Sequence, residues 1–141
     1  MIVLDTNVIS EMTRERPDPI VSAWLLRQPS PVLYTTSVTV GEALYGLEIM
    51  PAGRRRERLT RITLDVFDVE LRGKILPFDE HAARHYSRTL ASRRREGKPI
   101  SAFDAQIAAI TLAAGASLAT RNVADFEGCG VKLIDPWKAT D

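Results

Sequence analysis

Short, mostly apolar runs recur along the chain, and each is bounded by polar residues, glycine or proline. The first run, Met1 to Leu4, is apolar at every position and is followed by an acid, Asp5. An unbroken apolar run of this length is typical of a strand that is buried on both faces of a sheet. The pattern predicts strands at residues 1–4, 32–36, 75–78, 117–120 and 131–134.

The segments between these runs repeat their apolar residues at helical spacing. Val40, Leu44 and Leu47, for example, lie three or four positions apart, which places them on one face of a helix. Strands that alternate with helices favour an α/β protein in which helices cover both faces of a parallel sheet. The length of 141 residues suits a single domain, residues 1–141. Helices are predicted at residues 6–13, 20–26 and 39–50, between Gly53 and Gly73, and at 79–96, 101–114 and 122–126.

Four acidic residues follow the predicted strands or begin the helices behind them. Asp5 ends the first strand, Glu42 lies in the first turn after the second, and Asp125 follows the strand that ends at Thr120. Asp104 lies in the first turn of the most apolar helix. In sheets of this kind, ligands bind beyond the carboxyl ends of the strands, near the point where the strand order reverses. We therefore expect the four acids to lie on one rim of the sheet.

Each acid also has a simpler interpretation, as part of a helix N-terminal cap, where the helix dipole favours a carboxylate. Taken singly, this interpretation is favoured for every one of the four. Pairs with the spacing of a capping box, or nearly so, are Thr39 with Glu42, Ser101 with Asp104, and Asn122 with Asp125, and Asp5 could itself be an N-cap.

Four carboxylates on one rim would repel one another strongly. At ~4 Å, each pair costs about 4 kcal/mol at an effective dielectric constant of roughly 20. Several such pairs would rival the ~5 to 15 kcal/mol stability of a whole domain. A bound cation would relieve this repulsion, and ligands that are all carboxylate oxygens suit Mg²⁺ or Mn²⁺. The sequence therefore predicts a divalent metal site at this rim.

Other kinds of site have less support in the sequence. His81 and His85 stand four residues apart on a predicted helix, but no third zinc ligand is nearby. Cys129 is the one cysteine, so it cannot form a disulfide within the chain, and no histidine is spaced to make it a catalytic thiol. Neither a Gly-rich phosphate loop nor a Gly-x-Ser-x-Gly turn is present.

Composition changes this picture little, but the distribution of charge matters. The formal net charge is +1, from 19 Lys and Arg against 18 Asp and Glu, so overall charge does not identify a polyanionic partner. The arginines are grouped, above all within residues 54–61 and 84–98, and such groups are either solvated helix faces or contacts for phosphate. Without a secretory signal or a membrane-length apolar run, we expect a cytoplasmic protein with no membrane partner.

Several segments together resemble the PIN-domain ribonucleases, and their order and spacing carry the resemblance. It spans nearly the whole chain and implies a three-layer α/β/α PIN-like fold with a five-stranded parallel sheet. It also implies a Mg²⁺-dependent endoribonuclease, with Mn²⁺ as an alternative metal. The segments are Asp5-Thr6-Asn7, Ser37-Val-Thr-Val-Gly-Glu42, Ser101-Ala-Phe-Asp104 and Thr120-Arg-Asn-Val-Ala-Asp125-Phe126; Tyr45-Gly46 and Met50 to Arg54 are similar, more narrowly, to VapC and FitB-like toxins.

The resemblance implies a role for individual residues. Asp5 and Asp104 match the metal-binding acids of the family, and Glu42 and Asp125 match the other two acids of its catalytic pocket. Some members have a further acid where this chain has Asn122, so one tightly held metal is expected rather than two. The polar residues that would support the acids are Thr6, Asn7, Thr120 and Asn122.

The family also implies partners. Its toxins cleave RNA as homodimers and are blocked by a small VapB- or FitA-like antitoxin, in a heterotetramer or a larger assembly. DNA would be bound only through the antitoxin. The sequence does not distinguish transfer, ribosomal or messenger RNA as the substrate, because all present the same phosphodiester.

Three alternatives to this function remain open. A haloacid dehalogenase-like phosphatase also has an Asp after its first strand, but it needs a second Asp two residues later, where this chain has Asn7. A signalling receiver domain needs paired acids after its first strand and a Lys after its last, and neither is found. A catalytically inactive PIN-like binding module would be expected to have lost some of the acids, whereas this chain has the full set.

Overall fold

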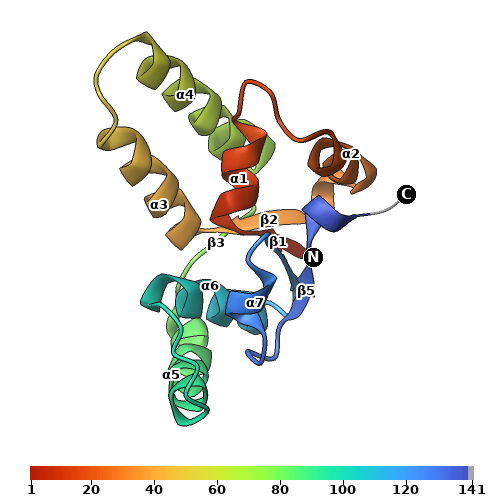
Figure 1. The fold of residues 1–141 in the computed structure, drawn as a ribbon, viewed down its shortest axis with the longest axis vertical. Helices are drawn as coiled ribbons and strands as arrows, with labels where there is room; N and C mark the ends of the chain where they lie inside the picture. The colour runs from red at the N-terminus through yellow and green to blue at the C-terminus, as the bar shows by residue number, and fades with distance from the viewer. Residues whose placement is uncertain (140–141) are drawn as a thin grey trace.

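A five-stranded parallel sheet forms the middle layer of the computed structural model, which describes residues 1–139 (Figure 1). The strand order is β3-β2-β1-β4-β5, and every neighbouring pair is parallel. Both the predicted α/β class and the five parallel strands are therefore confirmed. The strands are β1 (Ile2–Leu4), β2 (Leu33–Thr36), β3 (Ile75–Leu76), β4 (Ser117–Ala119) and β5 (Lys132–Ile134).

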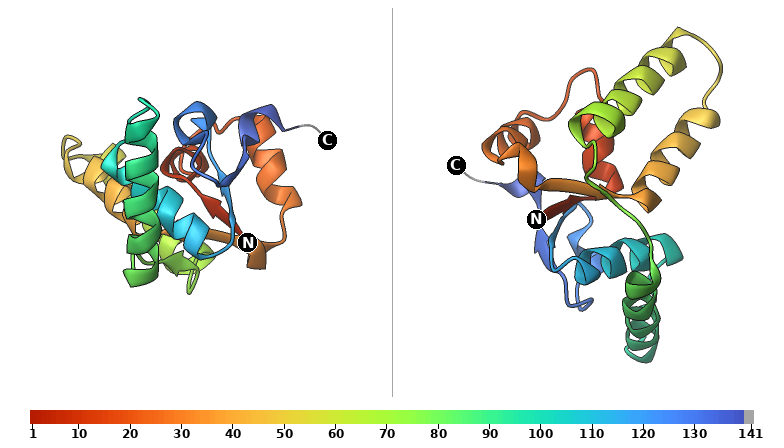
Figure 2. Two further views of the ribbon diagram at one scale, coloured as in Figure 1. Left: turned by 90° about the horizontal axis from the view of Figure 1, so that it is seen from below. Right: turned by 180° about the vertical axis from the view of Figure 1, so that it is seen from behind.

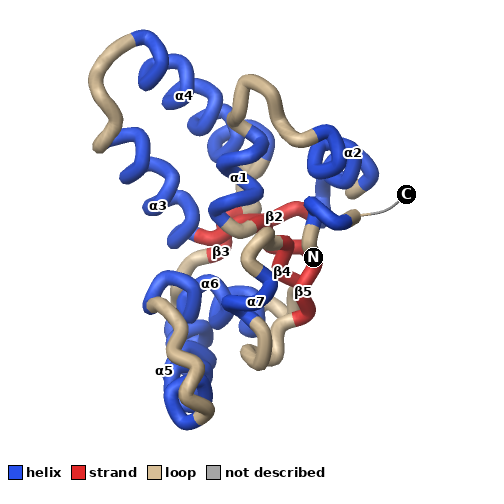
Figure 3. Tube along the Cα trace, in the orientation of Figure 1, coloured by secondary structure: helices blue, strands red, loops and turns tan. Residues whose placement is uncertain are grey.

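Helices cover both faces of the sheet, as the views in Figures 2 and 3 show. No helix within residues 1–139 is long and apolar enough to cross a membrane. Short 3₁₀ turns, η1 (Ser30–Val32) and η3 (Pro136–Lys138), lie before β2 and after β5. One layer contains α1 (Thr6–Met12), α2 (Pro19–Arg27), α3 (Ser37–Glu48), α4 (Arg54–Asp65) and the π-helical turn η2 (Val66–Glu70), and the other contains α5 (Glu80–Arg95), α6 (Ala102–Ala113) and α7 (Val123–Phe126).

The apolar runs of the strands supply both halves of the core. Leu4 of β1 packs with Val8 of α1 and Phe67 of η2 on one face. Its neighbour Val3 packs with Ile107 of α6 on the other face. Successive strand residues point to opposite faces, so a strand between two helical layers must be apolar at every position. This is why the opening run of the sequence does not alternate with polar residues.

Most predicted boundaries differ from the structure by one or two residues; the strand predicted at residues 75–78, for example, ends at Leu76. Two of the differences have a clear physical reason. The third helix begins at Ser37 rather than at residue 39, because the Thr36 hydroxyl accepts a hydrogen bond from the backbone N–H of Thr39 at 3.0 Å and so caps the helix. The helix predicted between Gly53 and Gly73 is divided at residue 65, and its last part is the π-helical turn. That turn buries Val66, Phe67 and Leu71 in one core cluster, an arrangement that periodicity alone did not predict.

The order of the strands reverses between β1 and β4, which fixes the place of the site. From β1 the chain moves outward to β2 and β3, and then returns through α5 and α6 to pair β4 with the other side of β1. The carboxyl ends of these two central strands lie side by side, and the backbone N–H of Asp5 donates to the carbonyl of Ala119 at 3.0 Å. Doubly wound sheets bind their ligands at such a point.

Candidate active site

Asp5 lies at the centre of the rim, directly after β1. Its side chain is only 4% exposed. One carboxylate oxygen accepts the backbone N–H of Thr6 at 2.8 Å, and the other accepts the hydroxyl of Thr120 at 2.7 Å and the amide of Asn7 at 3.2 Å. Three donors therefore fix the orientation of this carboxylate before any ligand is bound.

Asn7 and Thr120 join the ends of the two central strands. The Asn7 side-chain oxygen accepts the backbone N–H of Arg121 at 3.1 Å, so its amide nitrogen faces Asp5 and Thr120. The Thr120 hydroxyl also accepts the backbone N–H of Asn122 at 3.0 Å. Because the amide of Asn7 is committed to these bonds, the residue is a donor to Asp5 and cannot serve as the second carboxylate of a phosphatase.

Glu42 reaches the rim from α3. The hydroxyl of Thr6 donates to its carboxylate at 2.8 Å. The hydroxyls of Thr6 and Thr39 lie 3.1 Å apart, and those of Thr39 and Thr36 lie 3.3 Å apart. This chain of buried hydroxyls links α1 to the junction of β2 and α3. The sequence analysis did not include Thr36 and Thr39 among the site residues, although two hydroxyl residues at a strand-to-helix junction were a visible signal.

Asp104 and Asp125 complete the acidic rim from α6 and α7. Asp104 is half-buried in the first turn of α6, and Asp125 is exposed in the first turn of α7. The negative charge of Asp104 acts on Asp5, and that of Asp125 acts on Asp104. The four predicted acids therefore interact in pairs: Asp5 with Glu42 and with Asp104, and Asp104 with Asp125. Their catalytic roles stay predictions.

Burial and mutual repulsion raise the pKa of two of these acids. Burial, the largest cause, and the charges of Asp104 and Glu42 together raise the pKa of Asp5 to about 6, against the hydrogen bonds from Thr120 and Thr6. Burial also raises the pKa of Asp104, against its hydrogen bond with Ser101, and Asp125 adds to the rise. Carboxylates that are costly to ionise at a shared rim are typical of a functional site.

The capping interpretation is correct for some of these residues and wrong for others. Asp5 caps α1, and the Ser101 hydroxyl caps α6 by accepting the backbone N–H of Asp104 at 3.1 Å. Glu42 lies in the second turn of α3 rather than in its first, because Thr36 is the N-cap. Asn122 is exposed, and its side chain does not cap α7. Capping therefore explains the position of Asp104, but it does not account for Glu42.

The donor atoms of the rim fit a hard divalent cation. All are carboxylate, hydroxyl or amide oxygens, as Mg²⁺ and Mn²⁺ prefer. Within residues 1–139, no three acidic, histidine or cysteine side chains lie close enough to hold one ion together. This does not conflict with Mg²⁺, which is usually bound through one or two carboxylates and keeps several waters. The set of side chains at the rim is a poor match to zinc, which needs three or four protein ligands.

The raised pKa of Asp5 predicts how the stability of the metal-free protein depends on pH. The folded pKa, about 6, lies above the ordinary value of 3.8, so between these values the folded state binds more protons than the unfolded state. The contribution of Asp5 to the free energy of unfolding therefore falls as pH rises from about 4 to about 6. Asp5→Asn has no carboxyl group to ionise at this position. The variant should therefore not show this decrease in the free energy of unfolding, which is on the order of 2 to 3 kcal/mol.

Urea unfolding in EDTA over this pH range would measure the effect. The difference in unfolding free energy between Asp5→Asn and the parent protein should move in favour of the variant as pH rises. Asp68→Asn, which removes an exposed carboxylate, is the control and should show no such trend. A difference that stays constant from about pH 4 to about pH 7 would contradict the raised pKa.

The other chemically reactive residues do not form a second site. His81 and His85 on α5 pack edge to face, with their ring centroids 5.2 Å apart. Cys129 is buried, and burial raises the pKa of its thiol although Arg93 lies nearby. A buried thiol with a raised pKa is a poor nucleophile. The sequence interpretation of both features as non-catalytic agrees with these surroundings.

Comparison with known proteins gives consistent matches over the full chain. The PIN domain family model matches residues 2–127. The VapC ribonuclease Y4jK of Sinorhizobium fredii is 43% identical over 139 residues, which are 98% of this chain and 99% of the relative. The toxin FitB of Neisseria gonorrhoeae is 36% identical over 141 residues, with 97% and 99% covered. A structure of FitAB bound to an IR36 DNA fragment superposes with a TM-score of 0.92 at 33% identity, covering 100% of this chain and 99% of that one.

Proposed function

Because the chain belongs to the PIN domain family, we propose that it is a toxin of a toxin-antitoxin pair that hydrolyses RNA phosphodiesters. The observation that carries the proposal is the buried Asp5, held by three donors at the point where the strand order reverses and coupled electrostatically to Asp104 and Glu42. Relatives that are similar over almost the whole chain carry the names VapC ribonuclease and toxin FitB.

The charge of the rim supports a metal-dependent reaction. RNA phosphates are negative, and so are the four carboxylates, so the two would repel each other unless a cation lay between them. We propose that Asp5 and Asp104 hold one Mg²⁺ or Mn²⁺ ion, with Glu42 and Asp125 near it. When bound, the ion supplies positive charge to the phosphoryl oxygens and lowers the pKa of water.

The protein's own residues have defined tasks in this proposal. Thr120, Asn7 and the backbone N–H of Thr6 hold the Asp5 carboxylate in one orientation, and the Thr6 hydroxyl holds Glu42. Fixed carboxylates position the reacting groups without reorganisation during the reaction. No histidine base is required, because the exposed Asp125, which is not one of the two proposed metal ligands, can accept a proton near the attacking water.

Cleavage of end-labelled RNA by the purified protein tests this function. Cleavage is expected in Mg²⁺ or Mn²⁺ and should stop in EDTA, with recovery when the metal is returned in excess. Cleavage that is equal in EDTA would contradict the metal proposal alone. Absence of cleavage with either metal and with transfer, ribosomal and messenger RNA would instead favour a PIN-like module that only binds a partner.

We further propose that a small cognate antitoxin inhibits the protein. One solved neighbour is FitAB bound to a DNA fragment. We infer that this chain forms a homodimer that joins an antitoxin in a heterotetramer or a larger assembly. DNA would be bound through the antitoxin. Co-expression with the neighbouring reading frame is expected to give a complex that does not cleave RNA, as measured by light scattering and the cleavage assay. Mixing the two purified chains and finding neither complex nor inhibition would contradict this partner.

A further inference from the structure

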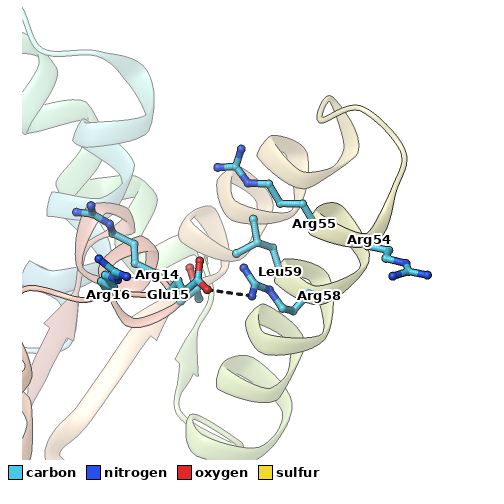
Figure 4. A pocket seen from close by; sticks show the side chains of 8 residues that line it. Arg14, Glu15, Arg16, Arg54, Arg55, Arg58 and Leu59 are labelled. Carbon is cyan, nitrogen blue, oxygen red and sulfur yellow. Dashed lines mark ion pairs between the residues drawn. The ribbon is translucent and has the colours of Figure 1, made fainter.

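A basic cleft lies beside the C-terminal end of α1, remote from the acids at its N-terminal end. It has a volume of about 770 Å³ and lies between the segment Thr13–Arg16 and the first half of α4. Its lining contains five arginines and one acid, Glu15, with Leu59 as the one large apolar side chain. Figure 4 shows Arg14 and Arg16 on one side and Arg55 and Arg58 on the other.

The space between the basic cleft and the acidic rim is partly hollow. A second cavity of about 210 Å³ runs between α1, α3 and α4. Thr6 and Glu42 line it at the acidic end, and Thr13 and Leu59, which also line the basic cleft, lie at the other end. Thr13, the C-cap of α1, lies seven positions after Thr6, a length of ~10 Å along the helix. A few nucleotides of an extended strand could therefore reach from the acids to the arginines.

Much of the positive charge in the cleft is not neutralised within the protein. Arg14 pairs with the buried Glu11 at 3.1 Å, and Arg58 pairs with Glu15 at 3.6 Å. Arg16 and Arg55 form no ion pair with any residue in the range 1–139 and are exposed. An excess of free guanidinium groups around a concave surface attracts an anionic partner.

We propose that this basic cleft binds phosphates of the RNA strand whose scissile bond lies at the acidic rim. The proposal rests on the proposed ribonuclease function and deepens it by assigning a substrate-binding surface. Guanidinium groups bind phosphate through paired hydrogen bonds. An acidic protein segment is the rival occupant, but protein contacts bury an apolar centre, and this cleft offers only Leu59. Positively charged grooves follow the phosphate backbone of single-stranded nucleic acids.

Binding of a fluorescein-labelled single-stranded RNA, measured by anisotropy in EDTA at several salt concentrations, tests the assignment. The double variant Arg16→Ala with Arg55→Ala is expected to bind about tenfold or more weakly. The slope of the logarithm of the association constant against the logarithm of the salt concentration is negative. Its magnitude should decrease by about 1.4 in the double variant, because two phosphate contacts are lost. A single-stranded DNA of the same sequence should show the same change in slope, since phosphates are contacted rather than bases.

A matched control removes two exposed arginines from outside the cleft. Arg61→Ala with Arg72→Ala makes the same change in net charge, and neither residue lines the cleft. This variant should keep the parent slope. Glu15→Gln should bind RNA several-fold more tightly, because it frees Arg58 from its ion pair.

Three results would overturn the assignment. One is an equal loss of RNA affinity in the cleft variant and in the control variant, which would indicate a general effect of net charge. Another is unchanged RNA binding by the cleft variant together with weaker antitoxin binding, which would make the cleft a protein contact. In both cases the parent protein would still cleave RNA, so the proposed function would stand. If the parent protein neither bound nor cleaved RNA, the cleft assignment and the proposed function would fail together.

Discussion

Replacing Asp5 with Asn is expected to reduce RNA cleavage by ~10²-fold or more while leaving the protein folded. The substitution removes the negative charge at the centre of the rim but keeps nearly the same shape. Thr6 can still donate its backbone N–H to the remaining side-chain oxygen. The loss would therefore come from the missing charge rather than from a disrupted fold.

Asp104→Asn is the companion variant and should show a comparable loss. Asp68→Asn removes an exposed carboxylate on η2 and serves as the control with the same change in charge. Initial rates on end-labelled RNA in Mg²⁺, with thermal unfolding of each variant, would give the comparison. Undiminished cleavage by Asp5→Asn or Asp104→Asn would show that the assigned acids do not carry the reaction.

Arg93→Ala is expected to destabilise the protein by about 3 to 4 kcal/mol, because it removes a buried guanidinium with several partners. Arg93 lies on α5 and is only 5% exposed. Its Nε donates to the carbonyl of Lys98 at 2.7 Å, and one Nη donates to the carbonyl of Glu127. These bonds join the turn before α6 to the loop after α7, so they stabilise the two segments that carry Asp104 and Asp125.

Thermal unfolding would measure this effect directly. A loss of this size should lower the melting temperature by about 10 °C for a domain of this length. Arg94→Ala, at the exposed neighbouring position on the same helix, is the matched control and should change the stability by less than about 0.5 kcal/mol. Equal melting temperatures for the two variants would contradict the role of Arg93 as a link between the loops.

The sheet could be predicted from the sequence because burial on both faces leaves a local signal. Runs such as Met1 to Leu4 must be apolar throughout when helices cover both sides of the strand, and glycines and prolines mark the ends. Asp5 was likewise visible, because a carboxylate directly after a buried strand lies where parallel sheets bind ligands. Glu42, Asp104 and Asp125 were visible from their positions near strand ends and in early helical turns, and the family resemblance assigned their roles. In the structure, Asp104 and Glu42 act electrostatically on Asp5, and Asp125 acts on Asp104.

Contacts between distant segments could not be predicted in the same way. The start of α3 depends on the hydroxyl of Thr36, a residue that the sequence pattern assigned to the end of a strand. The division of the Arg-rich helix depends on how Val66, Phe67 and Leu71 meet the core. The buried position of Arg93 was also hidden, because arginines in a group usually lie on a solvated face, and only the fold brings Lys98 and Glu127 to it.

The proposed function depends most on one property of the rim, the binding of a divalent ion by Asp5 and Asp104 together. Titration of the parent protein with Mn²⁺, followed by electron paramagnetic resonance, would test it without any RNA. We expect binding of one ion per chain at about pH 8, much weaker binding at about pH 5 where Asp5 is protonated, and loss of binding in Asp5→Asn and Asp104→Asn. Unchanged Mn²⁺ binding in either variant, or none in the parent protein at about pH 8, would contradict it.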